Sequence, residues 1–127
     1  NDSKSTSYSS SVEMLKRKNN IYWLLGGIPK KGDIFNLPQN YYKNIRGFIF
    51  GSNQKKYLTD LKKKIYLKKF SNLRKALSEL VSDIKKDHSS KKTILFSPAG
   101  ASFDSFENFE DRGEYFNKLI NRFINVI

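Results

Sequence analysis

The residue types best suited to ligand binding gather in the segment Ser97-Pro-Ala-Gly-Ala-Ser102, which is followed by Asp104. An apolar run, Thr93-Ile-Leu-Phe96, precedes it and is typical of a buried strand. Small residues let a ligand approach the backbone closely, and main-chain amides at a helix start attract anions. The pattern therefore predicts a buried strand, an anion-binding loop and then a helix, although composition alone fits an ordinary turn equally well.

The sequence lacks the residues and patterns of thiol, metal and nucleotide-phosphate sites. The sequence has no cysteine, which excludes disulfides and thiolate chemistry. Its single histidine, His88, lies in a polar run, and no cluster of His, Asp and Glu has the spacing of metal ligands. The phosphate-binding pattern Gly-x-x-x-x-Gly-Lys followed by Ser or Thr is also absent. The sequence therefore predicts neither a metal site nor a phosphate-binding loop in this chain.

Alternating apolar runs and helical patterns indicate the elements that must position these residues. The predicted strands share short, nearly continuous apolar character and lie near 21–26, 47–51, 65–67 and 93–97. Apolar spacing of three and four predicts helices over about 10–18, after Asn53, over 72–86 and from Phe116 to Ile127. Ser10 and Glu13 could form a capping box, and Asn53 could cap the second helix.

Strands that alternate with helices predict crossover connections. We therefore expect an α/β fold, Rossmann-like, with a mainly parallel sheet of about four strands and helices on both faces. The lysines of 65–70 predict an edge strand there. Ligands of such sheets bind at the carboxyl ends of the strands. This directs attention to the loops 1–7, 26–38 and 97–109.

The length of 127 residues predicts one domain over 1–127, and the start at Asn1 predicts a piece excised from a longer chain. No apolar run approaches the roughly 18 residues of a membrane span, and the N-terminus lacks a signal peptide. We therefore expect no membrane partner.

The net charge of +12 raises the alternative of a basic α/β module that binds RNA or another polyanion. Residues 1–92 hold 21 Lys and Arg against 7 Asp and Glu, but the lysines fall in separate clusters at 16–18, 62–64, 68–69 and 85–92. No nucleic-acid-binding motif accompanies them. Charge runs are usually solvated faces, so nucleic acid is the less favoured partner.

Three segments, in matching order, resemble signatures of the Mur ligases that add D-glutamate. The third segment matches the family's C-terminal signature at eleven positions: Ser97, Pro98, Ala99, Ala101, Ser102, Asp104, Phe106, Asn108, Phe109, Arg112 and Gly113. Gly100 stands where the family usually has cysteine. Asn1-Asp-Ser-Lys-Ser-Thr6 is similar to its Asn-Asp-Ser-Lys-Ala-Thr motif, and Ile21–Lys30 is similar to its strand leading to Gly-Gly-x-x-Lys.

The resemblance implies roles for individual residues. It implies D-glutamate binding by Thr6, Lys30, Ser102, Phe103 and Phe109, and it places Asp2 and Lys4 near the nucleotide. In the family, the threonine and the lysine hold the α-carboxylate, whereas the serine and the second phenylalanine hold the side-chain carboxylate. A dianion such as D-glutamate needs a cation and charge-assisted donors at fixed separation. Lys31, next to Lys30, leaves the site lysine uncertain by one position.

The resemblance also implies what lies outside this chain. Mur ligases need ATP and Mg²⁺, which in the family are held mainly by a central domain, and they bind UDP-N-acetylmuramoyl-L-alanine through an N-terminal domain. The chain would then be the C-terminal domain of a bacterial cytoplasmic ligase of peptidoglycan precursor synthesis, inactive by itself and without a catalytic residue of its own. The polyanion-binding module stays the alternative.

Overall fold

The computed structural model describes residues 5–6, 8–29, 31–52, 54–89, 91–97 and 102–104. Its helices are α1 (Tyr8–Arg17), α2 (Lys55–Leu61), α3 (Leu73–Lys86) and the 3-10 helix η2 (Gln39–Asn44). Its strands are β1 (Ser5–Thr6), β2 (Ile21–Leu25), β3 (Ile28–Pro29), β4 (Ile45–Phe50), β5 (Tyr66–Phe70), β6 (Thr93–Ser97) and β7 (Ser102–Asp104). The helix predicted from Phe116 to Ile127 lies outside the described residues.

The main sheet has five strands in the order β5-β4-β2-β6-β7. The first four are parallel, which confirms the predicted fold class and the four predicted strands. β5 lies at an edge of this sheet, as its lysines predicted. The fifth strand, β7, runs antiparallel to β6 and was not predicted, because three residues are too few to show alternation.

The strand order reverses at β2. The chain passes from β2 to β4 and β5 on one side and then returns to place β6 on the other side of β2. In parallel α/β sheets, ligands bind in the crevice where the order reverses, at the carboxyl ends of the strands. Leu25 pairs with Ser97 at that end, so β2 and β6 end next to each other.

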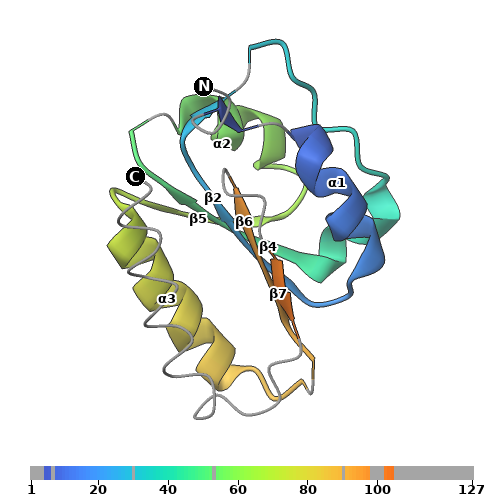
Figure 1. Cartoon of the computed structure of the whole chain (residues 1–127), viewed down its shortest axis with the longest axis vertical. Coiled ribbons are helices and arrows are strands. Elements are labelled where there is room, and N and C mark those ends of the chain that lie inside the picture. The colour runs from blue at the N-terminus through green and yellow to red at the C-terminus, as the bar shows by residue number, and fades with distance from the viewer. Residues whose placement is uncertain are drawn as a thin grey trace.

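One face of the sheet is covered by α3 (Figure 1). Its buried residues follow the predicted spacing: Leu73, Ala76, Leu77, Leu80 and Ile84. They pack on side chains of β2, β4 and β6. Asn72 caps the helix, because its side-chain oxygen accepts a hydrogen bond from the amide of Lys75 at 2.9 Å.

The opposite face is covered by α1 and α2 (Figure 1), which contribute Tyr8, Leu15, Tyr57 and Leu61 to a second core cluster with Trp23. Helices on both faces are therefore confirmed. Alternate residues of β2 point to the two clusters, which is why the strand is apolar throughout.

One predicted cap and part of one predicted loop need correction. α1 begins at Tyr8, so Ser10 lies inside the helix instead of capping it. Asn53 lies outside the described residues, and Gln54 is the N-cap of α2 without a side-chain capping bond. Residues 102–104, predicted as part of the 97–109 loop, form the strand β7. The predictions failed because short polar residues suit turns, caps and edge strands alike.

Candidate functional site

Two of the three predicted loop regions are brought together by the small parallel pair β1–β3. Ser5 pairs with Ile28, and Thr6 pairs with Pro29. Pro29 directly precedes Lys30 in the sequence. The N-terminal segment therefore runs beside the segment that follows β2 and leads to the candidate lysine.

The third region returns to the same end of the sheet. Ser102 pairs with Leu95 and Phe103 with Ile94, so the chain turns back along β6 after Ser97. Ser102 was predicted in a loop but opens β7. Its backbone lies opposite the middle of β6, two residues before the end at which β2 leads into the 26–38 loop.

The structure thus places the backbones of three of the seven candidate residues, namely Thr6, Ser102 and Phe103. The other four, Asp2, Lys4, Lys30 and Phe109, lie outside the described residues. Lys31 is described and exposed.

The Gly-Gly turn after β2 is fixed by its neighbours. A Cβ atom at Gly26 would lie 2.4 Å from ring carbons of Phe50, so only glycine fits. Gly27 has a φ of 84°, in the left-handed region that favours glycine. The buried hydroxyl of Tyr57 on α2 lies 3.3 Å from the carbonyl oxygens of both glycines and donates to them. These contacts set the direction in which the chain runs toward Lys30.

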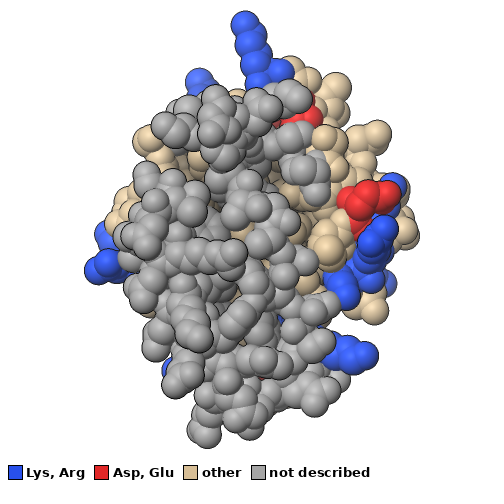
Figure 2. Space-filling model, viewed as in Figure 1, with Lys and Arg blue, Asp and Glu red and all other residues tan. Residues whose placement is uncertain are grey.

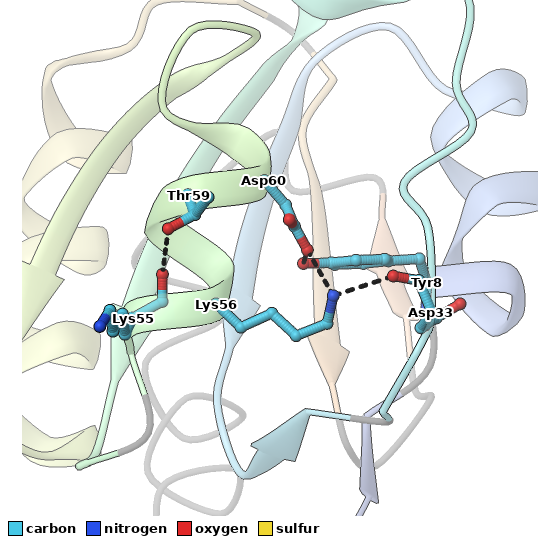
Figure 3. Close-up of polar contacts among 6 residues, drawn as sticks. All are labelled: Tyr8, Asp33, Lys55, Lys56, Thr59 and Asp60. Carbon is cyan, nitrogen blue, oxygen red and sulfur yellow. Dashed lines mark hydrogen bonds and ion pairs between the residues drawn. The ribbon is translucent and has the colours of Figure 1, made fainter.

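A polar network joins the same loop to α1 and α2 (Figure 3). The Oδ2 atom of Asp33 accepts a hydrogen bond from the main-chain amide of Tyr8 at 2.6 Å. Lys56 donates to the carbonyl oxygen of Asp33 and to the carboxylate of Asp60, each at 2.9 Å. The hydroxyl of Tyr8 donates to that carboxylate at 2.8 Å. No sequence signal marked these residues, because their contacts join positions up to 52 residues apart.

The phenol of Tyr8 is held in its protonated form. Burial raises its pKa well above the ordinary value, and the hydrogen bond to Asp60 raises the pKa further. Tyr8 is therefore a hydrogen-bond donor at any physiological pH. Its ring also packs edge-on against Phe35, with the ring centroids 5.4 Å apart.

A pocket of about 460 Å³ lies at the other end of the sheet, near the amino ends of β2, β4 and β5. Its lining residues are Tyr22, Arg46, Tyr66, Lys68, Asp83, Lys86, Asp87 and His88. Lys68 forms ion pairs with Glu79 and Asp83. Asp87 accepts hydrogen bonds from Tyr22 and Asn20. Much of the charge in this pocket is thus already paired, and the pocket is far from the three converging segments.

On the face shown in Figure 2, the described basic side chains do not form one continuous patch. In the view of Figure 2, lysine and arginine atoms appear at separate points around the rim, and acidic atoms lie next to some of them. Within the same residues, no group of three or more His, Cys, Asp and Glu could hold a metal ion. No helix in the described part of the chain is long and apolar enough to cross a membrane.

Comparison with known proteins agrees with the three motifs. The chain is 37% identical over 122 residues to the UDP-N-acetylmuramoylalanine–D-glutamate ligase of Rickettsia felis, covering 96% of this chain and 27% of the relative. The corresponding ligase of Rickettsia conorii is 38% identical over 94% of the chain and 24% of its own length. That of Rhizobium meliloti is 32% identical over 91% of the chain and 25% of its own length.

The chain therefore spans about a quarter of the length of these curated relatives. No family model matches it. Because the similarity covers 96% of the chain, it extends through residues 38–92. The motifs matched nothing in that stretch beyond the alternation of strands and helices. Neither these relatives nor the scattered charges support the polyanion-binding alternative.

Proposed function

Because this chain belongs to the Mur ligase family of UDP-N-acetylmuramoylalanine–D-glutamate ligases over the segment it spans, we propose that it is the D-glutamate-binding, C-terminal domain of such a ligase. The observation that carries the proposal is the convergence of the three motif segments. Thr6 pairs with Pro29, and Leu25 pairs with Ser97, so segments far apart in the sequence meet at one end of the sheet.

The ligand chemistry fits this convergence. D-glutamate carries two carboxylates and an amine, and each carboxylate needs charge-assisted donors. We assign the α-carboxylate to Thr6 of β1 and to Lys30, which follows β3 in the sequence, and the side-chain carboxylate to Ser102 and Phe109. Phe103 is assigned to D-glutamate without a particular carboxylate. Two donor groups on separate segments would hold both ends of the amino acid and orient its amine.

Asp2 and Lys4 precede Thr6, and we place them toward the nucleotide. We assign the site lysine to Lys30, because it occupies the lysine position of the Gly-Gly-x-x-Lys pattern that begins at Gly26. No residue of this chain is assigned a catalytic role: its groups bind and orient one substrate.

ATP and Mg²⁺ do not fit the described part of this chain. The sequence has no phosphate-binding loop, and no described cluster of acidic, histidine or cysteine side chains could bind Mg²⁺. Cleavage of bound ATP would supply the free energy for forming the amide bond. We propose that ATP, Mg²⁺ and UDP-N-acetylmuramoyl-L-alanine are held mainly by other domains of a longer chain, in the bacterial cytoplasm.

The assignment of D-glutamate to this chain and of the other substrates to other domains can be tested directly. The complete ligase should join D-glutamate to UDP-N-acetylmuramoyl-L-alanine and release phosphate from ATP. The purified 127-residue chain, given the same three substrates, should release none. Phosphate release from this chain that depends on D-glutamate would overturn the division. A complete ligase that is equally active with this segment deleted would overturn the assignment to D-glutamate.

A further inference from the structure

We infer that Asp33 is a positioning residue that fixes the separation between the two groups assigned to the α-carboxylate of D-glutamate, Thr6 and Lys30. The inference rests on the proposed function and extends it to a residue that none of the sequence motifs contains. Asp33 follows Lys30 by three residues, and its partner Tyr8 follows Thr6 by two. A bond between Asp33 and Tyr8 therefore ties together the two segments that carry these groups.

The bond is well suited to hold the first turn of α1. Tyr8 is the first residue of the helix, where main-chain amides lack partners within the helix. The Asp33 carboxylate accepts from that amide at 2.6 Å, so an aspartate from the 26–38 loop caps the helix across 25 residues of sequence. A negative charge at a helix N-terminus is also favoured by the helix dipole.

A second contact holds Asp33 from the other side. Lys56 of α2 donates to the Asp33 carbonyl oxygen and to Asp60, and Asp60 accepts from the Tyr8 hydroxyl (Figure 3). The side chain and the main chain of Asp33 are therefore bound by two different helices. Tyr8 is only 1% exposed, so its end of the network is fixed in the core.

The pairing of β1 with β3 cannot supply this precision alone. It comprises two residue pairs, Ser5 with Ile28 and Thr6 with Pro29, and so short a ladder is weakly determined. Charge-assisted donors lose much of their value when they are displaced from the acceptor. Loosening the Asp33–Tyr8 bond should therefore weaken D-glutamate binding without touching the nucleotide.

The test compares three variants in the complete ligase. Asp33→Ala removes the acceptor, Asp33→Asn keeps an acceptor oxygen but removes the charge, and Asp83→Ala is the matched control. Asp83 is likewise a partly buried aspartate with a polar partner, the ammonium of Lys68, but it lies at the opposite end of the sheet. The readouts are the KM for D-glutamate, the KM for ATP, kcat and the melting temperature.

Asp33→Ala should raise the KM for D-glutamate about tenfold while the KM for ATP changes by less than about twofold, as expected if the displaced segments lose one charge-assisted hydrogen bond to D-glutamate. Asp33→Asn should recover most of the loss, and Asp83→Ala should change neither KM. An Asp33→Ala variant that melts earlier but keeps the KM for D-glutamate would show a purely structural role and overturn the inference. If Asp33→Ala does not fold, Tyr8→Phe decides instead, since it removes only the hydroxyl bond to Asp60 in the same network. It should raise the KM for D-glutamate and leave the KM for ATP unchanged, and an unchanged KM for D-glutamate would overturn the inference.

Lys30→Ala serves as the reference for the proposed function. If Lys30→Ala raises the KM for D-glutamate and the Asp33 variants do not, the positioning role is wrong and the proposed function stands. If Lys30→Ala leaves that KM unchanged, the assignment of the lysine fails, whatever Asp33 does.

Discussion

Leu25 of β2 and Ser97 of β6 lie opposite each other in parallel register at the carboxyl end of the sheet. The segments that follow them contain Lys30 and Ser102, which are 72 positions apart in the sequence. We propose that this pairing lets the two distant segments bind one small ligand, and the first prediction below depends on it.

Removing either donor should weaken D-glutamate binding selectively. In the complete ligase, Lys30→Ala and Ser102→Ala should each raise the KM for D-glutamate by roughly ten- to a hundredfold, because a hydrogen bond to a charged group is worth about 1.5–3 kcal/mol. The KM for ATP should change far less. Lys30→Ala should be the more severe, since it leaves a carboxylate without its counter-charge.

The control for this pair is Lys31→Ala, which should be mild because the side chain is exposed. A severe Lys31→Ala together with a mild Lys30→Ala would move the site lysine by one position. If Ser102→Ala impairs ATP binding instead, the substrate assigned to Ser102 is wrong.

Gly26→Ala should destabilise the fold. The added Cβ would meet the Phe50 ring at 2.4 Å, and overpacking of this kind costs about 1–3 kcal/mol. Urea unfolding of this chain measures the loss. The double variant Gly26→Ala, Phe50→Leu should recover part of it, because a leucine leaves room for the methyl group. No recovery would place the cause in the backbone of Gly26.

The contribution of Asp87 to stability should depend on pH. Burial raises its pKa, but hydrogen bonds from Tyr22, Asn20 and Ser89 outweigh this and hold the pKa well below the ordinary value. Because the folded pKa is lowered, the stabilisation is complete above the unfolded value of about 3.9 and is lost as the pH falls through the folded value.

Tyr22→Phe should therefore cost about 1.5–3 kcal/mol of unfolding free energy at pH 7, and the cost should shrink only as the pH falls toward the lowered folded value of Asp87. Urea unfolding at pH 7 and at about pH 2 compares the two conditions. In an Asp87→Asn background, the cost of Tyr22→Phe should be smaller and independent of pH. An equal cost at both pH values in the unchanged background would show that Asp87 is not the group responsible.

Reversing the charge of Lys62, Lys63 and Lys64 should leave the activity of the complete ligase nearly intact. All three are exposed, and surface substitutions usually change stability by less than about 0.5 kcal/mol each. Lys64 should be the costliest, because its ammonium lies 5.6 Å from the centroid of the Phe35 ring. A hundredfold fall in turnover would restore a polyanion or nucleotide role for this cluster.

The sequence by itself determined the sheet, its parallel strands and the faces of α3. These follow from local patterns: β2 is apolar throughout because both of its faces are covered, and the buried residues of α3 recur every three or four positions. The motif residues also identified the family, because their types and spacing are specific even without coordinates.

Only the tertiary structure decided which polar residues meet. Asp33 caps α1, Asp60 joins Tyr8 to Lys56, and Tyr57 binds the Gly-Gly turn. A hydrogen bond constrains only the two groups that form it and imposes no period on the sequence. Short strands cannot be predicted from the sequence either, since two residues of β1 or three of β7 are too few to show alternation. Hydrophobic burial repeats along an element and can be read from it, whereas polar contacts depend on where the folded chain brings single side chains.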